Sequence, residues 1–446
     1  MKHLIGLTAM ALLSTTCLAK DLFVSSSGSD NTSYDNNNIN APWKTLIHAI
    51  YNLKAGDTLY IREGTYSPQY SLRLHSTYDS QNYGGHPTAT VNAESGTVNS
   101  PVLITAYENE EVIIDLETAR TFMFIENKNY WQIKNLSLIN SASAFVVSLN
   151  APADNIVFEN LKIYAKYGGD NSANIKVHSY GGTNVLIKNN LLEGPGTTSD
   201  IHQNTAVVYA RKTPSVTIEG NNISNAPIGI YFKHVNDTSD ANTTDILISD
   251  NFIHNTTRDA IQLNARYATV TNNIFGENCS GLNVTEANGG PGGDFNTISH
   301  NTFWGCGLTL RDDTQAGDLY PGSVGNTISN NIFANNLRIH PYTSLNHNST
   351  LSNNLYVNST ITNNGTEYTL DSWKSFSNQD SGSTENSVSF IADNQKNKLG
   401  FILNDNSAGK KSAPDGSDLG ANIDLSSMND ALHKDRPSKA SAITLD

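Results

Sequence analysis

One short phrase recurs along the middle of the chain and constrains the fold more than any other feature. It reads aliphatic-x-aliphatic-x-x-Asn-x-apolar, as in VTIEGNNI around Asn221. The same Asn position is filled in seven phrases, at Asn190, Asn221, Asn251, Asn273, Asn301, Asn331 and Asn354. Two upstream phrases keep the apolar spacing but carry Leu136 and Leu161 there. The nine phrases are 22 to 31 residues apart, a period typical of solenoid repeats.

Within each repeat the apolar residues alternate at period two, and Asn, Gly, Ser and Asp flank them. This pattern indicates short strands joined by turns rather than helices. A parallel β-helix accommodates such repeats, because equivalent positions of successive coils then stack about 4.8 Å apart. We therefore predict an all-β solenoid with a buried ladder of Asn side chains that bond to one another at a tight turn. We also expect these Asn residues to supply the left-handed conformation of that turn.

The N-terminal segment 1–19 is typical of an export signal. Lys2 supplies a positive charge, LIGLTAMALL an apolar core, and Cys17-Leu18-Ala19 a cleavage pattern of small residues. A lipid-modified Cys17 is the alternative. Since no later stretch is long and apolar enough to span a bilayer, we expect a soluble, monomeric protein that is secreted, to the extracellular space or the periplasm, and makes no membrane contact.

The composition restricts the partners. The formal net charge of −14 argues against nucleic acid as a partner. It leaves an acidic polymer open as a substrate, because a locally basic groove decides that binding. Cys279 and Cys306 fall in neighbouring coils before equivalent strands, so a disulfide between them is one outcome in an oxidising compartment.

The regions flanking the repeats suggest how the solenoid ends. Leu46, Ile47, Ile50 and Leu53 have helical spacing, which predicts a short helix that caps the open apolar end of the first coil. We expect the β-helix domain to span residues 20–360. Residues 361–446 lack the repeat and are expected to form an irregular tail packed along the side and C-terminal end of the solenoid.

The opening SSSGSD…APWKTLIHAI…LKAGDTLYIREGTY resembles that of exported right-handed β-helix proteins of the pectate-lyase-like superfamily, most of all polysaccharide lyase family 9. The ending LDSWKSFSNQDSGS…FILNDNSAGKKSAPDGSDLGANID is also similar to the C-terminal segments of these proteins. The resemblance implies a single-stranded right-handed parallel β-helix. It also implies a polysaccharide lyase that uses a Lys base and a calcium ion, although the same scaffold carries other activities.

A second strand follows each Asn phrase, and its alternate residues should face outward in two columns. This expectation takes Val207 and Tyr209 as inward-facing, like Ile230 and Phe232. The first outward column then holds Lys176, Val208, Tyr231, Gln262, Asn283, Thr309 and Arg338. The second holds His178, Ala210, Lys233, Asn264, Thr285, Arg311 and His340. Just past the strand ends come Tyr180, Arg211, Lys212, His234, Arg266, Glu286, Asp312, Asp313 and Tyr342.

These columns concentrate cations and aromatic rings on one sheet of an acidic protein. Such a groove suits an acidic polysaccharide, because guanidinium groups hold carboxylates and aromatic faces hold sugar rings. Exposed strands also carry polar and basic residues merely to prevent self-association. The substrate-binding candidates are Tyr180, Lys212, Tyr231, His234, Asn264, Arg338 and His340.

Cleavage of a uronate polymer by β-elimination needs a base for the proton alpha to the carboxylate and positive charge to stabilise the resulting dianion. Lys233 lies centrally and is the candidate base, with His178, Arg266 and Arg311 as further catalytic candidates. Glu286, Asp312 and Asp313 lie at adjacent coil ends and are the candidate calcium ligands, although a solvated turn needs no metal.

Two other classes of function stay open. A glycoside hydrolase or epimerase on this fold would draw on the same acidic group, since hydrolysis needs facing carboxylates. A non-catalytic carbohydrate-binding protein or adhesin would retain the Tyr and Arg residues and would lose nothing when Lys233 is replaced.

Overall fold

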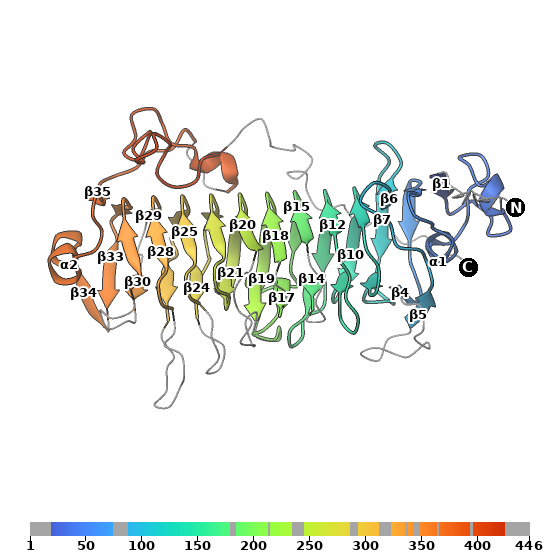
Figure 1. The fold of residues 1–446 in the computed structure, drawn as a ribbon, viewed down its shortest axis with the longest axis horizontal. Coiled ribbons are helices and arrows are strands. Elements are labelled where there is room, and N and C mark those ends of the chain that lie inside the picture. The colour runs from blue at the N-terminus through green and yellow to red at the C-terminus, as the bar shows by residue number, and fades with distance from the viewer. Residues whose placement is uncertain are drawn as a thin grey trace, which may run out of the picture.

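The computed structural model describes residues 19–74, 88–178, 184–212, 215–233, 245–285, 293–311, 323–334, 338–341, 348–363, 365–392 and 396–423. In residues 338–341 only the backbone is described. These residues form one elongated right-handed β-helix whose first and last coils lie at opposite ends (Figure 1). The predicted export signal, residues 1–19, lies almost wholly outside them.

Three parallel stacks of strands make up the wall of the solenoid. The first is a separate sheet: β1 (Asp21–Val24), β2 (Thr58–Ile61), β6 (Val102–Ala106), β9 (Trp131–Lys134), β12 (Ile156–Glu159), β15 (Val185–Lys188), β18 (Ser215–Glu219), β20 (Asp245–Ser249), β22 (Thr269–Thr271), β25 (Thr297–Ser299), β28 (Thr327–Ser329) and β31 (Thr350–Ser352). Its strands alternate buried and half-exposed residues, as the period-two pattern predicts.

The strands of the second stack begin just after the ladder position of the repeats, so the strands predicted to carry the outward columns belong to the third stack. The second stack contains β3 (Gly64–Tyr66), β7 (Val112–Asp115), β10 (Ser137–Ser141), β13 (Lys162–Ala165), β16 (Leu191–Glu193), β19 (Asn222–Lys233), β21 (Phe252–Leu263), β23 (Ile274–Phe275), β26 (Thr302–Trp304), β29 (Ile332–Ala334), β32 (Leu355–Val357) and β35 (Thr384–Glu385).

The third stack contains β5 (Thr88–Val91), β4 (Ser71–Leu74), β8 (Met123–Ile125), β11 (Phe145–Val147), β14 (Ala173–Val177), β17 (Ala206–Arg211), β24 (Leu282–Val284), β27 (Leu308–Leu310), β30 (Arg338–Pro341) and β33 (Thr360–Asn363). The long strands β19 and β21 run through both the second and the third stack. An antiparallel strand, β34 (Thr366–Tyr368), closes the third stack beside β33.

The predicted Asn ladder is confirmed as an internal feature. Asn251 is fully buried, and its Oδ1 accepts hydrogen bonds from the backbone N (3.0 Å) and Nδ2 (2.9 Å) of Asn221. Its own Nδ2 donates to Asn273 Oδ1 at 2.9 Å and to the Ile218 carbonyl at 2.8 Å. Each amide thus joins two coils and satisfies backbone groups at the turn.

One part of the ladder prediction is wrong. The left-handed residue of the turn precedes the ladder Asn, as at Asn189 (φ 53°), Asp250 (φ 58°) and His300 (φ 53°). The ladder Asn side chain must point into the solenoid to bond to its neighbours, so the adjacent residue absorbs the turn. The ladder ends at Asn354, whose Nδ2 donates to the buried carboxylate of Asp380 at 3.3 Å.

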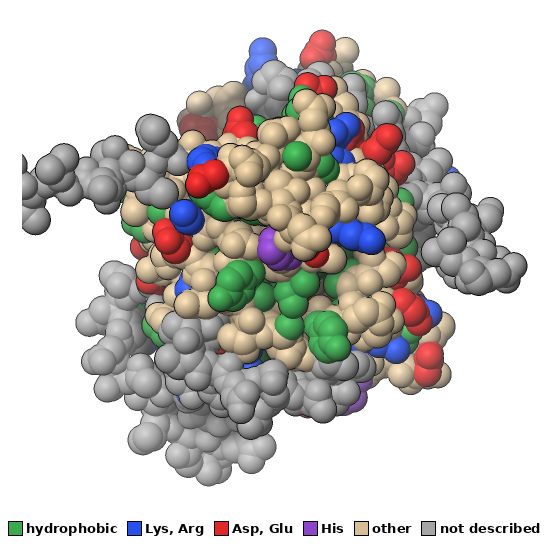
Figure 2. Space-filling model, turned by 90° about the vertical axis from the view of Figure 1, so that its right-hand side faces the viewer, with side chains coloured by type: hydrophobic (Ala, Val, Ile, Leu, Met, Phe, Trp, Pro, Cys, Tyr) green, Lys and Arg blue, Asp and Glu red, His purple; other side chains and the backbone are tan. Residues whose placement is uncertain are grey.

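A short helix covers the N-terminal end, as predicted. Helix α1 (Leu46–Tyr51) begins after Thr45, whose side chain accepts from the His48 backbone N at 3.3 Å, and it buries Leu46 and Ile50 against the first coils. Tan polar side chains and backbone cover much of this end of the molecule, with smaller hydrophobic patches between them (Figure 2). Among the described residues, no helix has the length and hydrophobicity needed to cross a bilayer.

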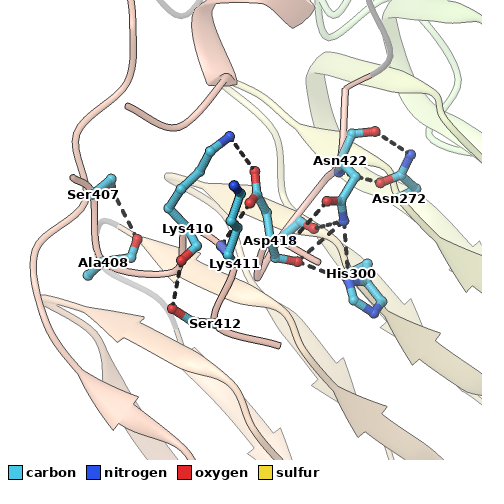
Figure 3. Close-up of polar contacts among 10 residues, drawn as sticks. Asn272, His300, Ser407, Ala408, Lys410, Lys411, Ser412, Asp418 and Asn422 are labelled. Atoms are coloured by element: carbon cyan, nitrogen blue, oxygen red, sulfur yellow. Dashed lines mark hydrogen bonds and ion pairs between the residues drawn. The ribbon is translucent and has the colours of Figure 1, made fainter. Parts of the chain in front are cut away.

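The C-terminal region caps the other end and then returns along the solenoid. Helix α2 (Leu370–Ser377) places Trp373 Nε1 2.8 Å from Asp380 Oδ2. Beyond it, the Asp418 carbonyl lies 3.2 Å from His300 Nδ1, and Asn272 Nδ2 donates to the Asn422 carbonyl at 2.9 Å (Figure 3). The predicted domain boundary at residue 360 falls inside the strand pairing, since β33 begins there and β35 adds a further strand.

Candidate active site

The third stack presents an outward column of polar and aromatic side chains near the middle of the solenoid. The register places Lys176 of β14 beside Tyr209 of β17, Tyr209 beside Tyr231 of β19, and Tyr231 beside Gln262 of β21. Asn283 and Thr309 continue the column. Five of the expected first-column residues are therefore aligned: Lys176, Tyr231, Gln262, Asn283 and Thr309.

In β17 the predicted register is wrong by one residue. Val208 and Ala210 pair with the inward-facing Ile230 and Phe232, so Tyr209 and Arg211 face outward in their place. The strand AVVYAR holds five apolar residues in a row, and Val207 is buried as well. Alternation therefore does not distinguish the two registers, and pairing with the neighbouring coils decides between them.

The second outward column brings His178, Arg211 and Lys233 together on successive coils. Arg211 pairs directly with Lys233, and His178 follows Val177, which pairs with Ala210. The next two residues of this column, Asn264 and Thr285, are buried and bond within the solenoid. Asn264 is 3% exposed and its Nδ2 donates to the Thr285 carbonyl at 2.8 Å.

We call Lys176, His178, Arg211, Lys233 and Arg258 the cationic cluster. Lys233 Nζ donates to Asn171 Oδ1 at 3.1 Å and lies 5.7 Å from the centre of the Tyr231 ring. Lys176 Nζ lies 5.4 Å from the centre of the Tyr209 ring, and the two tyrosine rings meet edge to face at 5.5 Å. The two rings thus separate and orient the two lysines.

The environment favours the uncharged forms of these bases. Burial lowers the pKa of Lys233, and the charges of Arg211 and Arg258 lower it further, against an opposing effect of Asp170. Burial also lowers the pKa of Lys176, with Arg211 and Lys233 acting in the same direction. Burial, Lys176 and Arg211 lower the pKa of His178 to about 4, so this imidazole is neutral at pH 7.

Two carboxyl groups lie near the cluster, in different surroundings. Asp170 Oδ1 accepts from Asn204 Nδ2 at 2.8 Å, and Asn204 Oδ1 accepts from Arg258 Nη1 at 2.6 Å. Asp259 is 6% exposed, and its burial raises its pKa to about 6 although Arg258 Nε lies 3.6 Å away. Asp170 is thus linked through Asn204 to Arg258, while Asp259 loses its proton at a higher pH than an ordinary aspartate.

Both predicted catalytic arginines, Arg266 and Arg311, lie outside the cluster. Arg266 Nε approaches Asp294 Oδ2 at 3.3 Å in the turn after β21. Arg311 follows β27 and is exposed, and its charge lowers the pKa of Asp259 rather than that of Lys233. Lys212, a predicted binding residue, lies in the turn after β17, where its backbone N donates to the Lys233 carbonyl at 3.3 Å.

Other predicted site residues cannot be placed with their side chains. Tyr180, His234, Glu286, Asp312 and Asp313 lie outside the described residues. Only the backbone of Arg338 and His340 is described, where His340 pairs with Thr309 and Arg338 with Thr360.

The described part of the chain contains no set of side chains that matches the predicted calcium site. No group of three or more His, Cys, Asp or Glu side chains there could hold a metal ion. Asp170, a carboxylate beside the cluster, accepts a hydrogen bond from Asn204 and raises the pKa of Lys233 and of Lys176 by its charge, and no such group of three side chains includes it. The predicted ligands Glu286, Asp312 and Asp313 remain a prediction.

Sequence reasoning did not select Asn171, Asp170, Arg258 or Tyr209. Asn171 and Asp170 lie in the turn before β14, and Arg258 lies in the middle of β21, so no column of alternating residues includes them. Tyr209 and Arg211 could have been found by aligning the lysine and tyrosine of NIKVHSY and GIYFKHV on AVVYARK.

The arrangement can bind an anion and accept a proton. Lys233 and Arg211 present a partly desolvated amine next to a permanent cation, and the neutral phenols of Tyr209 and Tyr231 can donate hydrogen bonds, because burial raises the pKa of both. The side-chain oxygens of Gln262 and Asn283 are buried and accept no hydrogen bond from the described residues.

Comparisons with known proteins agree with the fold. Residues 22–205 match the family model of the Pel9A-like right-handed β-helix region, and residues 122–303 match a general right-handed β-helix model. Pectate lyase PEL9 of Emericella nidulans is 31% identical over 145 residues, which cover 29% of this chain. The chain matches only 30% of the length of that relative.

Solved structures show the same architecture. XylC in its complex with xylose superposes with a TM-score of 0.51 at 12% identity, over 84% of this chain and 88% of XylC. The crystal structure of pectate lyase Pel9A gives a TM-score of 0.49 at 14% identity, over 90% of this chain and 96% of Pel9A. The similarity to XylC supports the right-handed β-helix fold and carries no information about activity.

Proposed function

Since the chain carries a Pel9A-like right-handed β-helix and is a distant homologue of a pectate lyase, we propose that it is a polysaccharide lyase that cleaves a uronate-containing polysaccharide by β-elimination. The observation that carries the proposal is the pairing of Lys233 with Arg211 in the cationic cluster. Elimination needs a neutral base beside a positive charge. Burial and the neighbouring Arg211 lower the pKa of the Lys233 amine, which favours its neutral form, and Arg211 supplies the positive charge.

In the proposed reaction, the neutral amine of Lys233 takes the proton from the carbon alpha to the uronate carboxylate. The electron pair of that bond forms the new double bond to the beta carbon, and the bond from the beta carbon to the glycosidic oxygen breaks. Arg211 and Lys176 stabilise the negative charge that develops on the carboxylate. The Tyr231 phenol, which stays protonated because burial raises its pKa, supplies the proton that the leaving oxygen needs. Proton exchange with solvent then restores the phenol and the neutral amine of Lys233.

Asn171 positions the base. Its Oδ1 accepts a hydrogen bond from Lys233 Nζ at 3.1 Å and so fixes the amine next to Arg211. Gln262 and Asn283 extend the same column away from the base, and their half-buried polar side chains can contact sugar hydroxyls. An acidic polysaccharide chain lying along the solenoid would contact both groups.

The proposal includes export. The sequence of residues 1–19 and the bond between Cys279 and Cys306, which joins neighbouring coils, both fit an oxidising compartment outside the cytoplasm. Calcium remains part of the proposal through the resemblance to family 9 lyases, with Glu286, Asp312 and Asp313 as the residues that would hold it. When bound, such an ion would neutralise substrate carboxylates.

The decisive experiment offers the protein pectate, alginate and glycosaminoglycans in turn and follows the ultraviolet absorbance of unsaturated products. We expect one uronate polymer to be cleaved, and Lys233→Ala to lower turnover by about 10²–10⁴-fold. Lys233→Arg should fail equally, because a guanidinium keeps its proton. An exposed lysine outside the cluster, changed in Lys44→Ala, is the control. Binding without product, or new reducing ends without unsaturation, would exclude the lyase in favour of a binding protein or a hydrolase.

A further inference from the structure

A second group of aromatic side chains lies in the turn that leads into the first sheet. The residue at this position has a left-handed backbone in several coils, and it is Asn or Gly at Asn155 (φ 57°), Asn184 (φ 58°) and Gly325 (φ 68°). Two coils instead carry Tyr267 (φ 58°) and Phe295 (φ 54°). Asn and Gly adopt this conformation readily, whereas a bulky side chain there is strained.

The two strained aromatic residues are also exposed. Tyr267 and Phe295 have exposed fractions of 42% and 40%, and their rings stack with centres 5.3 Å apart and planes inclined by 12°. Tyr130 shares the conformation further towards the N-terminus but is only partly exposed. The stacked pair therefore forms a flat apolar surface at a place where the fold itself would favour Asn or Gly.

Neighbouring residues hold this surface in place. The Arg266 guanidinium carbon lies 5.5 Å from the centre of the Tyr267 ring and 5.2 Å from that of Phe295. Its Nε lies 3.3 Å from Asp294, which in turn accepts from the Val324 backbone N at 2.9 Å. Gly325 leaves room for the Phe295 ring, since a Cβ there would come within 2.6 Å of it. Three successive coils thus build one unit.

We propose that Tyr267, Phe295 and Arg266, the aromatic platform, bind a sugar ring of the polysaccharide chain outside the cationic cluster. The CH face of a pyranose packs on aromatic rings, and a guanidinium beside them can hold a carboxylate. Tyr267 follows β21, whose Gln262 adjoins Tyr231 in the outward column. In this proposal a chain bound at the cluster also contacts the platform, which would add affinity for long substrates. The ligand class rests on the proposed function.

Replacement by Asn separates a binding role from a structural one. If the stacked rings stabilise the fold, Tyr267→Asn lowers the melting temperature. If they serve binding, Tyr267→Asn restores the residue that suits the turn, so the melting temperature stays the same or rises while binding weakens. Phe295→Asn should behave in the same way.

The test measures binding in a Lys233→Ala background, so that the polymer stays intact. Affinity electrophoresis in gels that contain pectate or alginate gives the dissociation constant, with dextran as a neutral polymer for comparison. We expect Tyr267→Asn and Phe295→Asn each to raise Kd for the bound uronate polymer about tenfold, or about 1.4 kcal/mol. Tyr51→Ala, which removes an aromatic residue of α1 that is 55% exposed, should leave Kd unchanged.

An unchanged Kd in both Asn variants, or a melting temperature lowered by several degrees in either, overturns the proposal. Failure of the lyase function has a different signature, because it appears as bound polymer without unsaturated product in the parent protein. With an active parent, the platform variants should also raise KM for long polymer and leave kcat on short oligomers unchanged, since no platform residue touches the reacting atoms.

Discussion

Lys233 Nζ and Asn171 Oδ1 lie 3.1 Å apart, although 62 residues separate them in the chain. Asn171 has a left-handed backbone (φ 56°) in the turn before β14, and Lys233 ends β19 two coils later. The contact holds the amine beside Arg211, so the turn that carries Asn171 contributes directly to the geometry of the proposed base.

This contact predicts the effect of a charge at position 171. Asn171→Asp keeps a residue that tolerates the left-handed turn and places a carboxylate next to Lys233, which should raise the pKa of the amine. The base must be neutral to act, so activity should rise with pH, and this rise should move to higher pH by roughly one unit. The pH dependence of kcat measures the shift.

Asn171→Gly is the matched variant, because it keeps the turn and removes the side chain. It should lower kcat without moving the pH profile to higher pH. An unchanged profile in Asn171→Asp would mean that Lys233 does not act as the base.

A second prediction concerns stability at acidic pH. Burial lowers the pKa of His254 from 6.5 to about 4, where its ring stacks on Phe252 at 4.5 Å. A depressed histidine pKa means that the unfolded chain binds the proton more readily. The contribution of the buried, neutral His254 to stability is therefore present above about pH 6.5 and is lost as the pH falls towards 4. The free energy of unfolding should fall by up to about 3 kcal/mol over this range.

His254→Gln should remove this dependence, because an amide does not titrate in this range. The comparison is the difference in melting temperature between variant and parent at several pH values from 7 to 4. Asp259, whose pKa is raised to about 6, has the opposite effect, because it adds stability as the pH falls. The prediction therefore concerns the difference in melting temperature between variant and parent, not the parent's melting temperature alone. Parallel curves for the two proteins would refute it.

The Asn ladder yields a third prediction. Asn251→Ala leaves the buried backbone N of Asn221 and the Ile218 carbonyl without their side-chain partners, and should lower the free energy of unfolding by roughly 1–3 kcal/mol. Denaturant titration measures this loss. Asn40→Ala, at an exposed loop position, should have little effect. Equal stability of the two variants would contradict a structural role for the ladder.

The fourth prediction concerns the divalent cation. If Glu286, Asp312 and Asp313 bind calcium that the reaction requires, a chelator should abolish product formation and added calcium should restore it. Asp312→Asn should raise the calcium concentration needed for half-maximal activity, as measured by titration. Full activity in excess chelator would leave Arg211 and Lys176 as the groups that neutralise the substrate carboxylate.

The sequence by itself determined the solenoid, because its signals are local and periodic. The alternation of apolar and polar residues, as in VTIEGN, predicts which side chains are buried. The recurring Asn, at positions such as Asn221 and Asn251, predicts which residues of successive coils stack on one another. Leu136 and Leu161 confirm this reading, since both are buried where the ladder has apolar members. The helix at Leu46–Tyr51 followed from spacing in the same way.

Only the tertiary structure decided which residues meet at the candidate site. Lateral contacts between coils join Asn171 to Lys233 and Arg258 to Asn204, and no periodicity encodes such pairs. In AVVYAR the run of apolar residues is compatible with either alternate set of side chains facing inward. Pairing with β14 and β19 determines that Val208 and Ala210 face inward. Arg266 is engaged by Asp294 and two rings for the same reason, because burial and charge act through space rather than along the chain.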